Sequence, residues 1–228
     1  MGFLVERLEA VRRRIAAAEA AAGRPAGSVA LLAVSKTRTA AEIASLHAAG
    51  QAAFGESYLQ EALAKRAALA GLPLEWHFIG PLQSNKTRAV AEQFAWVHSV
   101  ERLKIAQRLS AQRPAALPPL QVCLQVNISG EASKSGAAPR AVAELAAAIA
   151  ALPRLQLRGL MAIPAPSADP QAARAPFRAL RELSAGLRSA GIALDTLSMG
   201  MSDDLEAAIA EGATVVRVGT ALFGPRPT

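Results

Sequence analysis

The chain has 228 residues, of which 52% are hydrophobic and 19% charged, and this composition excludes a disordered tail protein or a collagen-like chain. No apolar run reaches the roughly 18 residues of a membrane span, and the first 23 residues, with Glu6 and Glu9, are typical of an amphipathic helix rather than a secretory signal. The one cysteine, Cys123, excludes an internal disulfide and suits a reducing compartment. We therefore expect a soluble cytoplasmic protein without a membrane partner.

The charge is basic but dispersed. Lys and Arg number 25 against 18 Asp and Glu, a net charge of +7. The basic residues follow helical patterns without forming a dense block, and aromatic residues, at 4%, leave little for stacking on bases. This pattern indicates a solvated, Arg-rich surface and no nucleic-acid partner.

Short apolar runs alternate along the chain with longer helical patterns. The runs are rich in Val, Leu and Ile and do not alternate strictly with polar residues, which is typical of parallel strands covered on both faces. We expect eight strands, at residues 29–35, 52–55, 75–79, 96–100, 120–127, 155–163, 194–199 and 214–218.

Helix-start signals occupy several of the intervening segments. Residues 39–42 form a capping box and residues 57–60 resemble a second one. Asp169 followed by Pro170 predicts a capped helix, which Pro176 is expected to delay or kink. A hydroxyl and two acids, Ser202, Asp203 and Asp204, stand at the start of a further expected helix, LEAAIAEG, which ends at Gly212.

Eight strand–helix units predict the α/β class and a (β/α)8 TIM barrel with short loops, since about 250 residues is typical of that fold. We expect one domain over residues 1–228, with residues 1–27 as an extra N-terminal helix packed on the barrel. A doubly wound open sheet is the alternative. Ligands of such barrels bind at the C-terminal ends of the strands, where the sequence places Lys36, Glu56, His77, Asn127, Met161, Ser198 and Arg217.

Lys36 ends the first predicted strand after six mostly apolar residues. Partial desolvation at a barrel mouth would lower the pKa of its amine and favour condensation with a carbonyl group. A Schiff base is therefore one interpretation, and a solvated surface lysine is the other.

Two C-terminal segments predict an anion site. Gly200 allows a close backbone approach, and Ser202 precedes a helix whose N–H groups favour a phosphate. Gly219 and Thr220 follow the last strand and offer backbone N–H groups and a hydroxyl; ordinary caps and turns are the alternative. Arg217, if it points inward, needs an acceptor, because burying a lone guanidinium is costly; a surface salt bridge is its other interpretation.

Long ordered motifs, covering about residues 30–224, resemble the YggS/PROSC family of pyridoxal phosphate homeostasis proteins. They are AVSKT at 33–37, FGESYLQEA at 54–62, WHFIGPLQSNK at 76–86, VHSVE at 97–101, QVNISGEASKSG at 125–136, RGLMAI at 158–163, LSMGMSDDLEAAI at 197–209 and VRVGTALFG at 216–224.

The resemblance implies a relative of the alanine racemase barrel that holds pyridoxal 5′-phosphate (PLP) as an aldimine of Lys36. It implies phosphate contacts from Ser202, Gly219 and Thr220. It places Arg217 against the pyridine nitrogen, and the remaining cofactor-binding residues are Met201 and Ser198.

A guanidinium opposite the ring nitrogen keeps that nitrogen unprotonated and the cofactor a poor electron sink. The expectation is therefore a protein of PLP homeostasis and delivery without robust turnover and without catalytic residues. Its expected partners are PLP and PLP-dependent apo-enzymes, and it is expected to be a monomer because it lacks the second domain of alanine racemase. The alternatives are a low-activity PLP-dependent racemase or lyase, and a lysine-imine aldolase without a cofactor.

Other polar residues have open roles. Ser57 stands where the family usually has Asn, so a contact from an amide there is in doubt. Lys134 is either a second amine near the phosphate or solvated, and His77 either lines the pocket or is a hydrogen-bonded core residue; His47 and His98 are taken as structural or exposed. No His, Cys or Asp spacing suits a metal, and Cys123 is expected to be a buried, inert thiol.

Overall fold

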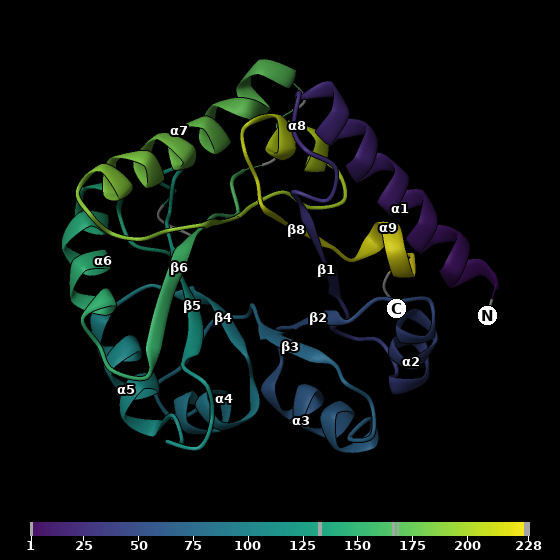
Figure 1. The fold of residues 1–228 in the computed structure, drawn as a ribbon, viewed down its shortest axis with the longest axis horizontal. Helices are drawn as coiled ribbons and strands as arrows, with labels where there is room; N and C mark the ends of the chain where they lie inside the picture. Colours follow the sequence, from purple (N-terminus) through teal and green to yellow (C-terminus); the bar gives the residue numbers. More distant parts are fainter. Residues whose placement is uncertain (1, 132–133, 166, 168, 226–228) are drawn as a thin grey trace.

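A computed structural model describes residues 2–131, 134–165, 167 and 169–225. Eight parallel strands form a closed barrel in chain order, with β8 hydrogen-bonded to β1, and the helices surround it (Figure 1). Closure confirms the TIM barrel and excludes the open sheet, because an open sheet would leave two edges. The strands are β1 (Ala30–Val34), β2 (Ala53–Glu56), β3 (Glu75–Phe78), β4 (Trp96–Val100), β5 (Leu120–Gln125), β6 (Leu155–Met161), β7 (Thr196–Ser198) and β8 (Val215–Val218).

Each predicted strand is present, with ends that differ by a few residues. The helices are α1 (Gly2–Ala21), α2 (Ala40–Ala48), α3 (Leu59–Ala68), α4 (Thr87–Gln93), α5 (Leu103–Gln112), α6 (Val142–Ala150), α7 (Pro170–Ser189), α8 (Leu205–Ala210) and α9 (Thr220–Phe223), with a 3-10 turn at Pro139–Ala141. The capping box is confirmed at α2, where Thr39 Oγ1 accepts from the Glu42 N–H at 3.2 Å. Asp169 caps α7 by accepting from the Gln171 N–H at 3.0 Å.

Two predicted helix details are wrong. The N-cap of α3 is Tyr58, without a side-chain bond, so residues 57–60 form no capping box; the Ser57 backbone instead lies against Gly80, where a Cβ would be 2.3 Å from the Ser57 oxygen. Helix α7 begins at Pro170, so Pro176 does not delay it. Helix α8 begins at Leu205, as expected, and ends at Ala210, two residues before Gly212.

The two faces of the strands differ in chemistry. Outward-facing residues pack with the helices in one continuous apolar core. TIM-barrel interiors are usually filled by bulky branched side chains. Here the interior holds buried polar groups instead. His98 on β4 bonds to Ser198 on β7, and these strands are not neighbours in the ring, so the bond crosses the interior. The buried polar residues joined in this way are His77, His98, Ser198 and Arg217.

Helix α1 lies outside α8 and α9 (Figure 1) and buries Leu8, Val11 and Ile15. It ends at Ala21, before the predicted residue 27. Its arginines bond to backbone oxygens of the barrel: Arg7 Nη1 to Thr220 at 3.2 Å and Arg14 Nη2 to Ser202 at 2.9 Å. Both contacts reach the loops predicted to hold an anion.

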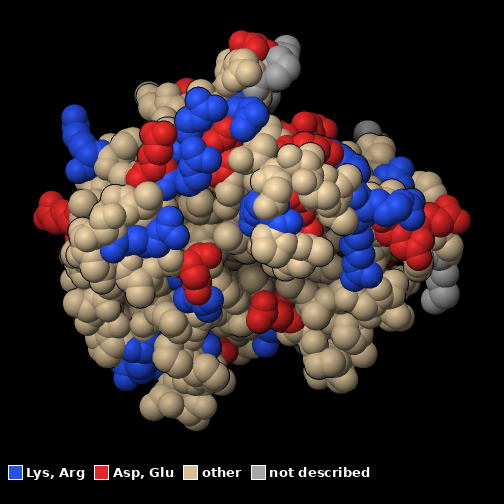
Figure 2. Space-filling model, turned by 45° about the horizontal axis from the view of Figure 1, so that its top comes forward, with Lys and Arg blue, Asp and Glu red and all other residues tan. Residues whose placement is uncertain are grey.

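Within the described residues, no helix is both long enough and apolar enough to cross a membrane. On the face shown in Figure 2, basic and acidic side chains are interspersed rather than gathered into one block. Three arginines of α7 surround one buried carboxylate, that of Glu211, at 2.7–3.2 Å: Arg174, Arg178 and Arg181. These arginines therefore serve packing between α7 and α8.

Candidate functional site

Lys36 lies at the C-terminal end of β1, two residues beyond the strand, and is partly buried. The chain turns immediately after it: Thr37 has φ 64°, a left-handed conformation that is unusual for a β-branched residue. The Thr37 N–H donates to Glu61 Oε1 at 2.6 Å, so α3 stabilises this turn. The backbone of the predicted anchor is thus held in a specific, strained geometry.

A second lysine lies beneath this turn. Lys65 Nζ donates to the Ser35 carbonyl at 2.6 Å, to Glu56 Oε1 at 2.7 Å and to Glu61 Oε1 at 2.5 Å. Burial raises the pKa of Glu56, against the opposing bonds from Lys65 and Ser35. This cluster ties the ends of β1 and β2 to α3 and supports the segment that carries Lys36.

Arg217 is buried inside the barrel, which confirms the inward orientation and excludes the surface salt bridge. Its Nη1 donates to the Ser198 carbonyl at 2.6 Å and to Ser198 Oγ at 2.8 Å, and its Nη2 donates to the Ala162 carbonyl at 2.9 Å. Burial lowers its pKa to about 10, which leaves it charged at neutral pH. Among the described residues no carboxylate forms an ion pair with it: its hydrogen-bond acceptors are neutral, and the charge of Asp204 favours its cationic form.

The two predicted anion loops lie together. Ser202, in the loop after β7, accepts a hydrogen bond at its Oγ from the Ala221 N–H at 3.2 Å, at the start of α9. Gly200 has φ 93°, and a Cβ there would be 2.6 Å from the Ala208 Cβ, so the loop requires glycine. Gly219 immediately precedes α9, and Thr220 is exposed.

Met201 belongs to the same loop. Its N–H donates to Asp204 Oδ1 at 2.5 Å, so this amide is already satisfied by a carboxylate. The Met201 side chain is partly buried beside a cavity of about 520 Å³ that also contacts Arg174 and Glu206.

Ser198 links Arg217 to a group that sequence reasoning missed. Its hydroxyl lies 2.8 Å from Nδ1 of His98, which is fully buried. His98 Nε2 lies 2.9 Å from His77 Nδ1, and His77 Nε2 lies 2.7 Å from Glu75 Oε1. The expectation of a hydrogen-bonded core histidine is confirmed for His77. The one sequence signal for the contact between His77 and His98 is that each histidine stands within a mostly apolar strand.

Residues 7–227 match the family model of the alanine racemase N-terminal domain. The chain is 65% identical to the pyridoxal phosphate homeostasis protein of Pseudomonas aeruginosa over 226 residues, covering 99% of this chain and 97% of the relative. It is 53% identical to the protein of the same name from Escherichia coli K12, covering 99% and 98%. The chain belongs to the pyridoxal phosphate homeostasis protein family.

Solved structures agree with this assignment. PipY of Synechococcus elongatus, 40% identical, has been solved without PLP (TM-score 0.86) and with PLP bound (TM-score 0.85), each covering 97% of this chain and 100% of that one. The alanine racemase of Corynebacterium glutamicum, 20% identical, has a TM-score of 0.70 over 97% of this chain and 62% of that one, a likeness of fold alone.

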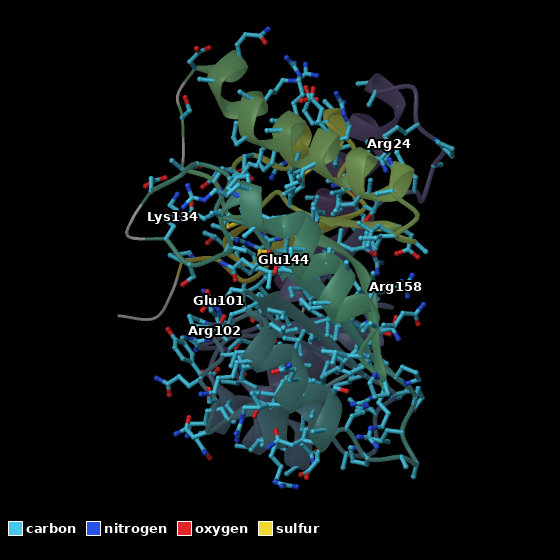
Figure 3. The ribbon with its side chains drawn as sticks, turned by 90° about the vertical axis from the view of Figure 1, so that its left-hand side faces the viewer. Arg24, Glu101, Arg102, Lys134, Glu144 and Arg158 are labelled. Carbon is cyan, nitrogen blue, oxygen red and sulfur yellow. The ribbon has the colours of Figure 1, made fainter. Side chains whose placement is uncertain are left out.

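The structure shows the surroundings of two residues whose roles were left open, Lys134 and Ser57. Lys134 forms an ion pair with Glu131 at 2.9 Å, and it lies with Glu101 and Arg102 on the side of the molecule opposite Arg158 (Figure 3). Ser57 is half-buried just after β2.

Cys123 is buried, and burial raises the pKa of its thiol to about 12, as expected for an inert thiol. Among the described residues no three His, Cys, Asp or Glu groups cluster as metal ligands.

Proposed function

We propose that this chain binds PLP at the C-terminal mouth of the barrel and takes part in PLP homeostasis by holding and delivering the cofactor. The observation that carries the proposal is the buried Arg217 guanidinium, which is hydrogen-bonded to neutral acceptors on β7 and at Ala162. Its strand leads into the Gly219–Thr220 turn, and the next residue, Ala221, bonds to Ser202. The PLP-bound PipY structure supports it through the shared fold and 40% identity. The proposed cofactor-binding residues are Lys36, Ser198, Met201, Ser202, Arg217, Gly219 and Thr220.

The chemistry of these groups fits PLP. The Lys36 amine would bind the aldehyde carbon with loss of one water, and the loops at Ser202 and Gly219 would take the phosphate. Bound PLP supplies an electron-withdrawing ring, whose strength depends on protonation of its nitrogen. A guanidinium can only donate there, so Arg217 would keep the ring nitrogen unprotonated and weaken that chemistry.

This weak electron sink favours a carrier over an enzyme, and the relatives are named for homeostasis. We include in the proposal that the chain acts as a cytoplasmic monomer that supplies PLP-dependent apo-enzymes. The likeness of fold to alanine racemase favours one second candidate, a PLP-dependent racemase or lyase of low activity.

Borohydride reduction tests the attachment. Protein incubated with PLP is reduced and digested, and mass spectrometry is expected to find the pyridoxyl group on Lys36. Lys36→Ala should remove the adduct, whereas Lys134→Ala should retain it. Labelling of another lysine in the wild type would contradict the assignment.

Incubation of the loaded protein with single amino acids then separates the two candidate functions. The proposal expects neither racemisation nor loss of the amino acid beyond one equivalent. Sustained turnover that Lys36→Ala abolishes would establish the second candidate instead.

A further inference from the structure

A continuous series of hydrogen bonds crosses the barrel interior from Arg217 to Glu75. It runs through Ser198, His98 and His77, at donor–acceptor distances of 2.7–2.9 Å. The series joins β8, β7, β4 and β3, so it spans the barrel rather than following one strand. Glu75, at the first residue of β3, is half-exposed at the N-terminal rim, opposite the proposed cofactor site.

When both imidazoles are neutral, the chemistry of the two ends sets the direction of every bond. A carboxylate only accepts, so His77 Nε2–H donates to Glu75, and the neutral imidazole then accepts at Nδ1. His98 must therefore donate from Nε2 and accept at Nδ1 from the Ser198 hydroxyl. Ser198 Oγ in turn accepts from Arg217, which only donates. Both neutral histidines are therefore Nε2–H tautomers.

The surroundings agree with neutral imidazoles. Burial lowers the pKa of His77, with Glu75 opposing, and burial together with the charges of His77 and Arg217 lowers the pKa of His98 well below its usual value. Trp96 stacks on His77, with ring planes 4° apart. The other charged or titratable groups that face this series from β5, β6 and the loops beside β7 are Cys123, Arg158, Asp195 and Asp204.

We propose that Glu75, His77 and His98 are positioning residues, which hold Ser198 and the Arg217 guanidinium in one orientation toward the proposed cofactor site. The reason is geometric: with its own proton directed at His98, Ser198 Oγ presents its lone pairs to Arg217. If the proton turned toward the guanidinium, the bond from Arg217 to Ser198 Oγ would be lost. The part of this inference that concerns PLP rests on the proposed function, whereas the orientation of Arg217 does not.

The consequence is a link between two opposite rims of the barrel. Glu75 lies at the end of the series away from the cofactor site. Replacing it removes the acceptor of the His77 Nε2–H bond, and a change of tautomer at His77 also changes the tautomer of His98. A purely structural role for Glu75 would affect stability and leave the guanidinium of Arg217 unchanged. These two roles therefore predict different spectroscopic results.

The test is nuclear magnetic resonance of the full chain with 15N-labelled histidine and arginine, first without PLP. We expect a scalar coupling across the bond from His98 Nε2 to His77 Nδ1 and slowly exchanging Nη–H signals from Arg217. Glu75→Ala should remove the coupling and broaden the Arg217 signals, and Glu75→Gln, which keeps an acceptor oxygen, should restore both. His47→Gln, on α2, identifies the third histidine and serves as the control.

Addition of PLP labelled at the ring nitrogen gives a second readout. Glu75→Ala is expected to shift that nitrogen resonance and to weaken PLP binding roughly threefold, the size of a modest coupling between sites. His98→Asn should weaken PLP binding more than Glu75→Ala does. Because Glu75 is half-exposed, Glu75→Ala is expected to fold even if His98→Asn does not.

The outcomes are distinct. Absence of the coupling in the wild type would overturn the proposed series, and unchanged Arg217 signals in Glu75→Ala would overturn its positioning role. If PLP does not bind the wild type, the proposed function fails, while the measurements without PLP still decide the orientation of Arg217.

Discussion

The Ser202 hydroxyl accepts the Ala221 N–H at 3.2 Å and so joins the loop after β7 to the loop after β8. Residues 19 positions apart in sequence therefore form one surface. The bond places a hydroxyl beside the start of α9, where the cofactor's phosphate is proposed to lie. It also means that replacing Ser202 affects both loops together.

Ser202→Ala should weaken PLP binding about tenfold, because it removes one charge-assisted hydrogen bond worth roughly 1.5–3 kcal/mol. Titration of PLP, followed by its visible absorption, measures the dissociation constant. Ser45→Ala, which removes an exposed hydroxyl on α2, is the matched control. Equal affinities of Ser202→Ala and the wild type would remove Ser202 from the site.

Arg14 of α1 is expected to support the same loop from outside. Its guanidinium donates to the Ser202 carbonyl at 2.9 Å and to both Glu206 oxygens at 2.8 and 2.9 Å. Arg14→Ala should lower the free energy of unfolding by about 1 kcal/mol and increase the rate of PLP release. The neighbouring Arg13, an exposed residue 3.9 Å from Glu9, is the control, and its replacement by Ala should change stability by less than about 0.5 kcal/mol. Indistinguishable PLP release from both variants would show that α1 does not support the loop.

Lys65→Met should destabilise the protein strongly. Glu56 is fully buried, and its Oε1 accepts from Lys65 and from Ser35, so loss of the lysine leaves a charge without its cation. Breaking such a buried pair costs about 3–5 kcal/mol. Urea denaturation measures the loss, and the double variant Lys65→Met with Glu56→Gln should recover part of it. A double variant as unstable as the single one would contradict this account.

The stability of the chain should fall as the pH decreases from about 6.5, the ordinary pKa of histidine. The pKa values of His77 and His98 are lowered in the folded protein, so in this range the unfolded chain binds protons that the folded chain does not. The slope is about 1.4 kcal/mol per pH unit for each such histidine. Urea denaturation between pH 7 and pH 5 tests this, and a flat profile would show that the imidazoles titrate normally.

Much of this architecture was accessible from local patterns. Apolar runs of strand length, capping residues at 39–42 and at Asp169, and eight strand–helix repeats predicted the barrel, since each depends on neighbours in sequence. The prediction of Ser57 as a cap failed because its backbone packs against Gly80, a contact of 23 positions that no local pattern reports.

The sequence by itself determined which residues end the strands, and with them the lysine, the arginine and the two small-residue loops of the proposed cofactor site. Only the tertiary structure decided what Arg217, Ser198 and the two histidines contact. Their hydrogen bonds join strands up to 100 positions apart, and closure of the barrel alone brings those strands face to face. The physical reason is that hydrophobic periodicity reports which side of an element is buried, whereas the partner of a buried polar group depends on which strands the ring sets opposite each other.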